Sequence, residues 1–282
     1  MLTNERMGYL ALGILWLNSG LVATAALRQA AALWRRARWW IACDPIEGAT
    51  GRFRGRIVDG PAAALVVQQL GRFGATQEKS IVWHDRGVRS EVLGGAVELD
   101  GGARAQLVST GSAEVWIDDS ELERAARCPD APTFASTWER ARQPKGVTRE
   151  VRVVLEPGRS VEIVGTLRRR GDTLALVAPS EADPGAPLVV STLDGARWLR
   201  RRALAVFLGF VPAVLAGAAL CTALALTAPI FESWPSKLGG LAGLGFFLAV
   251  LPAGTAVRDA LRVPSRRPLG GHWRAPRGGA AS

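Results

Sequence analysis

Three long stretches without a charged residue constrain this chain more than any other feature. They run from Met7 to Leu27, from Ala203 to Thr227 and from Leu238 to Val257, and they contain 21, 25 and 20 residues. Crossing the apolar core of a bilayer takes about 20 residues at about 1.5 Å per residue, so each stretch is long enough. Buried helices of a soluble protein are the alternative, but three such runs are unusual there. The pattern therefore predicts three transmembrane helices.

The positive charge of the chain is concentrated beside these stretches. The net charge is +10, yet residues 44–196 hold 19 Lys and Arg against 22 Asp and Glu. Because the remaining residues hold 16 against 3, the basicity belongs to the membrane borders and does not indicate a nucleic-acid partner. Of those 16 charges, 14 fall on one side of an alternating three-span path. The positive-inside rule then predicts an outer N-terminus, with residues 44–196 and the C-terminal tail in the cytoplasm.

Tryptophan and arginine residues gather where the predicted spans meet this cytoplasmic side. We interpret them as membrane-interface residues, in which aromatic rings lie at headgroup level and arginines extend toward water. They are Trp34, Arg35, Arg36, Arg38, Trp39 and Trp40 after the first span, and Trp198, Arg200, Arg201 and Arg202 before the second. Residues 29–41 read as an amphipathic extension of the first helix. The alternative for the first span is a cleavable signal peptide, because residues 23–25 read Ala-Thr-Ala, but the apolar region is long and arginines follow it.

Small residues recur at every fourth position in the second and third spans. Such spacing lets helix backbones approach closely in lipid. The residues predicted to pack are Gly209, Ala213 and Gly217, and Gly245, Ala249 and Ala253. Either an antiparallel hairpin of the two spans or a homo-oligomer would use this spacing. Since the three stretches contain no ionisable Asp, Glu, Lys, Arg or His, an ion path is not indicated.

The region between the first two spans has the pattern of a β-rich domain. Short β-branched runs alternate with glycines, and turns at 100–102 and 171–172 indicate hairpins. Residues 119–127 and 133–143 read as short helices. We therefore predict an α-helical integral membrane protein with a mainly antiparallel β (α+β) soluble domain between spans one and two. The predicted regions are 1–43 (first span and juxtamembrane segment), 44–196 (soluble domain), 197–260 (helical hairpin) and 261–282 (a basic, disordered tail).

Part of the soluble domain resembles a known family. The motif consists of Pro144, Lys145, Gly146, Gly158 and Gly165. It is similar to the beside-a-membrane domain of GIDE-type proteins, and the resemblance extends over roughly residues 7–210. Eukaryotic members are mitochondrial outer-membrane ubiquitin or SUMO ligases with a C-terminal RING domain, and the resemblance implies a domain on the non-cytosolic side. The charge distribution of this chain implies the opposite side, and we keep that prediction.

The chain lacks the residues for a RING or for an obvious catalytic centre. A RING needs eight Cys or His ligands, and this chain has Cys43, His84, Cys128, Cys221 and His272. His84 and Asp85 are neighbours, but adjacent strand residues face opposite ways. The acidic group at 118–123 lacks the spacing of a calcium loop and suits a helix start. We therefore predict no catalytic residue, no metal and no cofactor.

The function predicted from the sequence is a membrane-anchored, non-catalytic sensor or interaction module. Only 3 of the 35 basic residues are lysine, a bias typical of a GC-rich prokaryotic genome, so the membrane is predicted to be a bacterial or archaeal plasma membrane. The expected partners are the bilayer and an unidentified protein or small molecule bound by the soluble domain. The alternative is a component of the ubiquitin-ligase family that acts with a RING or other effector on a separate chain.

Overall fold

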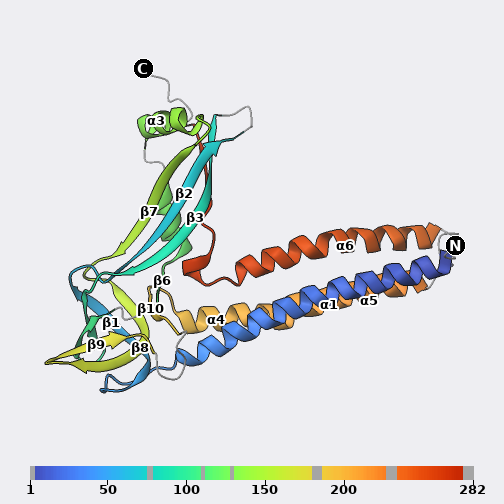
Figure 1. The fold of residues 1–282 in the computed structure, drawn as a ribbon. Coiled ribbons are helices and arrows are strands. Elements are labelled where there is room, and N and C mark those ends of the chain that lie inside the picture. The colour runs from blue at the N-terminus through green and yellow to red at the C-terminus, as the bar shows by residue number, and fades with distance from the viewer. Residues whose placement is uncertain are drawn as a thin grey trace. The chain divides into compact units, whose positions relative to one another are not determined.

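The computed structural model divides the chain into two compact units. It describes residues 4–74, 79–108, 112–127, 130–179, 186–226 and 234–275, with the backbone alone for 4–8, 225 and 234–242. The helical unit comprises Met1–Arg38 and Ala196–Arg262, and the β unit comprises Trp39–Gly195 and Val263–Ser282 (Figure 1). Each unit is therefore built from two separate pieces of the chain.

Long helices make up the helical unit. They are α1 (Asn4–Arg36), which continues into η1 (Ala37–Trp39); the continuous run of α4 (Gly195–Ala205), η2 (Val206–Phe210) and α5 (Val211–Leu226); and α6 (Trp234–Ala260). The η2 turn is π-helical, and the N–H of Val211 bonds to the carbonyl of Val206. Pro212 explains this widening, because its ring cannot donate a hydrogen bond and crowds the preceding turn.

Small and polar residues join these helices to one another. The indole Nε1 of Trp16 in α1 donates to Oγ1 of Thr222 in α5 at 2.9 Å. A Cβ added at Gly217 would lie 2.3 Å from the ring of Phe246, so this glycine brings α5 close to α6. Gly254 likewise allows α6 to approach Val22 of α1, where an added Cβ would lie 2.8 Å from Cγ1. All three helix pairs are therefore in direct contact.

Two of the three predicted spans are supported by length and composition. The segments Tyr9–Trp39 and Gly195–Leu224 are long and apolar enough to cross a membrane. The third predicted span, 238–257, lies within α6 and is not supported. The prediction of three spans is therefore confirmed for two of them.

A five-stranded barrel forms one end of the β unit. The larger sheet has the order β1-β4-β5-β9-β8-β10-β6, and a further pairing of β1 with β8 closes five strands into a barrel. The pairs β5–β9 and β10–β6 are parallel and the other pairs in this sheet are antiparallel. Its strands are β1 (Thr50–Asp59), β4 (Ala96–Leu99), β5 (Arg104–Leu107), β6 (Ala113–Trp116), β8 (Ser160–Arg170), β9 (Thr173–Val177) and β10 (Leu188–Ser191). Barrels of five strands include the OB fold, an architecture that does not by itself indicate a function.

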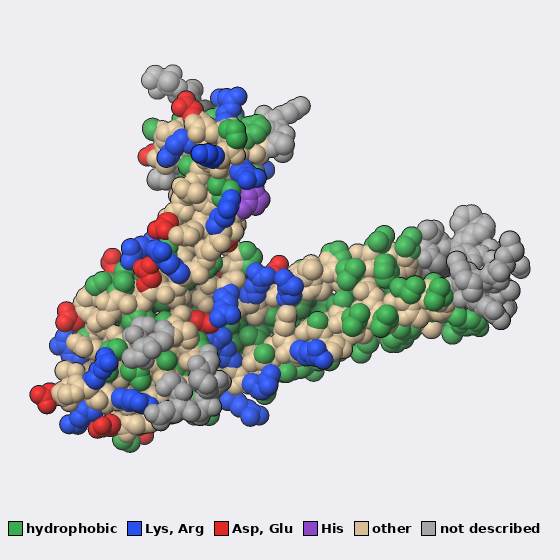
Figure 2. Space-filling model, in the orientation of Figure 1, with side chains coloured by type: hydrophobic (Ala, Val, Ile, Leu, Met, Phe, Trp, Pro, Cys, Tyr) green, Lys and Arg blue, Asp and Glu red, His purple; other side chains and the backbone are tan. Residues whose placement is uncertain are grey.

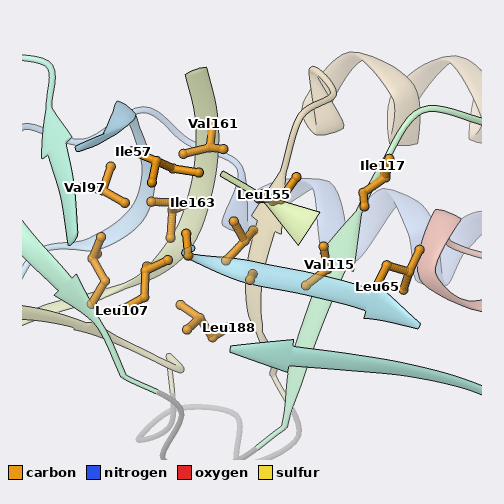
Figure 3. Packing of buried hydrophobic residues seen from close by; sticks show 14 of the residues in the cluster. Ile57, Leu65, Val97, Leu107, Val115, Ile117, Leu155, Val161, Ile163 and Leu188 are labelled. Carbon is orange, nitrogen blue, oxygen red and sulfur yellow. The ribbon is translucent and has the colours of Figure 1, made fainter. Parts of the chain in front are cut away.

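A second, four-stranded antiparallel sheet completes the unit. Its order is β11-β3-β2-β7, and its strands are β2 (Ala63–Phe73), β3 (Ser80–Val92), β7 (Val147–Leu155) and β11 (His272–Arg274). Two helices, α2 (Asp119–Ala126) and α3 (Ala131–Ala141), connect β6 to β7. Apolar side chains of both sheets share one core, which includes Leu65 and Leu155 of the second sheet and Ile57 and Ile163 of the barrel (Figure 3).

The β-rich prediction for residues 44–196 is confirmed, with one correction outside that range. The turns at 100–102 and 171–172 join β4 to β5 and β8 to β9 as antiparallel hairpins. The tail from residue 261, predicted to be disordered, instead contains η3 (Pro264–Arg266) and β11, which pairs with β3. Backbone pairing and buried contacts order this segment in spite of its glycines and arginines, a feature that composition alone does not reveal.

Candidate functional site

The predicted membrane-interface residues fall into two groups. Trp34 is 41% exposed on α1, and most of the neighbouring arginines are exposed as well. Trp198 is half-buried and lies under the guanidinium of Arg202, 5.5 Å from its carbon to the ring centroid. Trp40 differs, because it is only 2% exposed and stacks on Trp116 at 5.1 Å between ring centroids. Since its ring belongs to the interior of the β unit, a headgroup-level position does not fit Trp40.

Most of the predicted small-residue stripe faces away from the other helices. Gly217 packs against Phe246, as described above. An added Cβ at Gly209 or Gly245 would meet no atom within 4 Å, and Ala213 and Ala249 are exposed. Ala253 is half-buried. The hairpin is instead packed through a neighbouring face of α5 that includes Val214, Ala218 and Cys221, all of them buried. The four-residue spacing of small residues therefore did not predict which side of the helix makes contact.

The residues that carry the family resemblance have structural roles in the β unit. Pro144 and Lys145 lie in the exposed turn between α3 and β7. Gly146 and Gly158 have positive φ angles of 69° and 90°, which glycine adopts without strain. Gly165 lies in β8, where an added Cβ would be 2.6 Å from the carbonyl oxygen of Val177. The motif therefore specifies turns and a close strand approach, and none of its five residues presents reactive chemistry.

A hollow on the barrel is the candidate binding site of the β unit. Its volume is about 600 Å³. Four segments line it: Arg54–Arg56 of β1, the turn at 98–102, Ser160–Glu162 at the start of β8, and Ser191–Asp194 after β10. Strands and turns that are distant in sequence meet here because β1 pairs with both β4 and β8. The closure of the barrel is thus what creates the hollow.

The lining of this hollow has an excess of negative charge. It contains the carboxylates of Glu98, Asp100, Glu162 and Asp194, and the guanidinium groups of Arg54 and Arg56. Both guanidinium groups are engaged with the protein, since Nε of Arg54 donates to Oε1 of Glu162 at 2.9 Å and Nε of Arg56 donates to the carbonyl of Gly158 at 2.9 Å. The hydrogen bond and charge of Glu162 raise the pKa of Arg54 above its usual value. Because Glu162 also accepts from Nη1 of Arg52 at 3.3 Å, the negative charge that suits a positively charged ligand group comes mainly from Glu98 and Asp100.

A second cluster holds the C-terminal tail on the four-stranded sheet. The guanidinium of Arg149 lies between the rings of Trp83 and Trp273, at 3.9 and 4.2 Å from their centroids. The carboxylate of Asp85 accepts the backbone N–H groups of Leu269 and Gly270. The indole Nε1 of Trp273 donates to the carbonyl of Ala126 at 2.9 Å. Sequence reasoning missed this tail-docking cluster, although a tryptophan within a basic Gly/Pro-rich tail was a signal for it.

Ion pairs extend the same docking. Arg266 lies 3.3 Å from the carboxylate of Glu114, and Arg267 pairs with Asp119 at the start of α2. Glu121 of α2 pairs with Arg159 of the β7–β8 connection, and this pairing raises the pKa of Arg159. The acidic start of α2 is therefore occupied by protein cations, apart from Asp118, which caps the helix.

The predicted His-Asp neighbourhood does not form a pair. His84 is exposed, whereas Asp85 binds the backbone of the tail. Within the ranges that the structure describes, no three His, Cys, Asp or Glu side chains come together in a way that could hold a metal ion. Cys128 lies outside the described residues.

Comparisons with known proteins give no relative. No family model matches this chain, and no curated protein or solved structure matches it either. The resemblance to GIDE-type domains therefore stays a prediction that rests on the motif residues, and the functional argument rests on the two units themselves.

Proposed function

We propose that this protein is a non-catalytic binding module held in a prokaryotic plasma membrane by three spans, with the β unit at the cytoplasmic face. The apolar exterior of the helical unit is the observation that carries the proposal. Leu17, Leu21 and Leu208 are 64%, 63% and 76% exposed. A soluble protein rarely presents large apolar residues over a whole bundle, whereas a bilayer solvates such a surface.

The docked tail supports the third span. Because β11 pairs with β3, residues 39–195 and 263–275 belong to one folded unit and lie on the same side of any membrane. The chain between them must therefore cross the bilayer an even number of times. If the α4–α5 helix crosses once, α6 is the element that returns the chain, and its 27 residues reach about 40 Å at the usual rise. The docking of the tail on the β unit therefore supports α6 as the third span.

The distribution of charge in the helical unit supports the orientation. Lys and Arg side chains gather at one end of this unit, while hydrophobic side chains are spread along the described part of its visible face (Figure 2). That end is where α1 ends, α4 begins and α6 ends, and its arginines include Arg35, Arg200 and Arg258. Positive charge beside a span stays on the cytoplasmic side.

The barrel hollow is the proposed binding site of the module. Its excess of carboxylates complements a basic side chain, so we expect a partner that inserts a Lys- or Arg-containing segment. Its open, polar lining and the absence of a nucleophile–base pair among the described residues fit recognition better than turnover. The proposed membrane topology and the proposed binding site are separate, since the topology does not depend on the ligand of the hollow.

Reporter fusions test the topology. A fluorescent reporter and a periplasmic phosphatase are each inserted in the segment 183–186, between α5 and α6 at residue 230, and after Ser282. We expect fluorescence without phosphatase activity at 183–186 and after Ser282, and phosphatase activity at residue 230. Phosphatase activity at 183–186 would overturn the proposed orientation and would favour the non-cytosolic side that the family resemblance implies. Fluorescence at residue 230 would show that the α4–α5 helix does not cross.

A further inference from the structure

A groove along α1 is the feature of the helical unit that the proposed function does not use. It has a volume of about 470 Å³ and is lined by Trp16, Leu17, Gly20, Leu21, Thr24, Ala25 and Arg28. Trp16, Gly20, Thr24 and Arg28 form one row at intervals of four residues, and Leu17, Leu21 and Ala25 form the adjacent row. Such rows run nearly along a helix axis and enclose a shallow channel. Gly20 keeps the channel open, because an added Cβ there would meet no atom within 4 Å.

The two ends of this groove differ in chemistry. At one end the Trp16 indole is held in place by its hydrogen bond to Thr222. At the other end Arg28 is exposed, and its guanidinium makes no hydrogen bond or ion pair with a residue that the structure describes. Between them the lining is mainly apolar. A ligand that fits has a long apolar part and an anionic group at one end.

The length and position of the groove match one leaflet of a bilayer. From Trp16 to Arg28 the helix rises about 18 Å, slightly more than half of the ~30 Å apolar core. The uncharged stretch of α1 ends at Leu27, so Arg28 is the first charged residue after it and lies at the boundary of the apolar core in the proposed orientation. The groove then opens toward the acyl chains of the cytoplasmic leaflet, and Arg28 is level with their phosphates.

We infer that this groove binds one anionic phospholipid, with an acyl chain along Gly20 and Thr24 and the headgroup phosphate on Arg28. A planar guanidinium binds a phosphate through two parallel hydrogen bonds. A second copy of the chain is a poorer occupant, because a two-fold contact between parallel α1 helices would bring the two Arg28 charges to the same end. The inference rests on the proposed membrane location of the helical unit.

Lipid binding to the full chain in a mild nonionic detergent tests this inference. The probes are phosphatidylglycerol and phosphatidylcholine, and the readouts are lipids retained in native mass spectrometry and the thermal shift on lipid addition. Arg28→Gln removes the phosphate contact, and we expect about a fivefold lower apparent affinity for phosphatidylglycerol, as for loss of one basic residue near an anionic headgroup. Gly20→Leu fills the channel, and we expect retention of both lipids at this site to be lost.

Matched controls separate the groove from the rest of the surface. Arg201→Gln removes another exposed arginine from the basic end, and Gly13→Leu adds the same side chain at another open glycine of α1. Gly13→Leu should bind lipid as the wild type does, and Arg201→Gln, at the predicted interface but outside the groove, should lower the affinity for phosphatidylglycerol less than Arg28→Gln does. Equal loss in Arg28→Gln and Arg201→Gln would overturn the inference in favour of general charge attraction. A change of oligomeric state in Gly20→Leu without a change in lipid binding would overturn it in favour of a second copy.

A preceding extraction keeps this test independent of the proposed function. Wild type and variants are treated with alkaline carbonate, which releases proteins that are not embedded in the bilayer. If the wild type is released, the membrane location itself is wrong. If all forms stay embedded and the lipid preference does not respond to Arg28→Gln or Gly20→Leu, only the lipid site is wrong.

Discussion

The most exposed leucines of the helical unit and the core leucines of the β unit have opposite environments. In the β unit, Leu65, Leu167 and Leu176 are completely buried, whereas in the helical unit Leu17, Leu21 and Leu208 are more than 60% exposed. Burial in the β unit removes apolar surface from water, which is the main contribution to its stability. The exposed leucines of the helical unit gain nothing in water, and they fit the membrane location proposed for this unit.

The contacts within each unit follow from this difference. Lipid is as apolar as leucine, so helices in a bilayer cannot be held together by the hydrophobic effect. The helical unit contains the kinds of contact that would hold it in the proposed bilayer, namely the close approaches at Gly217 and Gly254 and the hydrogen bond between Trp16 and Thr222. The β unit packs large side chains such as Ile163 and Leu155 into a shared core. One chain thus combines two modes of stabilisation.

The largest expected effect comes from making the same substitution in both units. Leu176→Ala removes a completely buried side chain in β9 and should destabilise the β unit by about 2–5 kcal/mol. Leu208→Ala, at 76% exposure, should change the free energy of unfolding by less than about 0.5 kcal/mol. Thermal and chemical unfolding of both variants in the same detergent measures the difference. Equal losses would show that Leu208 packs against protein and not lipid.

A smaller effect is expected where the chain returns to the β unit. Trp273→Ala removes the ring contacts to Trp83 and Arg149 and the hydrogen bond to the Ala126 carbonyl, and should cost about 2 kcal/mol. We also expect faster tryptic cleavage of the tail after Arg266. Trp34→Ala, at an exposed site on α1, is the control and should leave both readouts unchanged. An intact tail in Trp273→Ala would mean that the β11–β3 pairing and ion pairs suffice.

Local patterns in the sequence predicted the helices and hairpins that depend on residues close together in the chain. Uncharged length identified α1 and the α4–α5 helix, and the glycine turns at 101 and 171 identified two hairpins. The strand β2 was not predicted individually, because it is buried along most of its length and lacks the alternation of a half-exposed strand. Burial on both faces depends on neighbours that the sequence does not reveal.

Features formed by distant segments were beyond such patterns. The barrel hollow depends on β1 pairing with both β4 and β8, and the tail-docking cluster joins Asp85 and Arg149 to residues more than 100 positions away. Trp40 was assigned to the membrane interface because arginines precede it, but its burial is decided by Trp116. The order of residues along the chain does not show which of them are neighbours in space.

The smallest expected effect is the loss of a helix cap in the β unit, and its size should depend on pH. Oδ1 of Asp118 accepts the N–H of Ser120 at 2.8 Å and its hydroxyl at 2.5 Å, and these bonds lower the pKa of Asp118 from its usual 3.8. Because the folded pKa is below the unfolded one, the stabilisation is present above pH 3.8 and is lost as the pH falls through the folded value. Asp118→Ala should cost about 1 kcal/mol at pH 7.

The pH dependence of this cost is the decisive readout. The difference between wild type and Asp118→Ala should shrink as the pH falls below 3.8, since the protonated cap accepts the same bonds less well. Thr222→Val is the matched change in the helical unit, because it removes the hydrogen bond from Trp16 and should cost about 0.6 kcal/mol. Neither of its partners titrates, so that cost should be the same at pH 7 and pH 3. A cost that varied equally with pH at both sites would mean that acid acts on the whole protein and not through the cap.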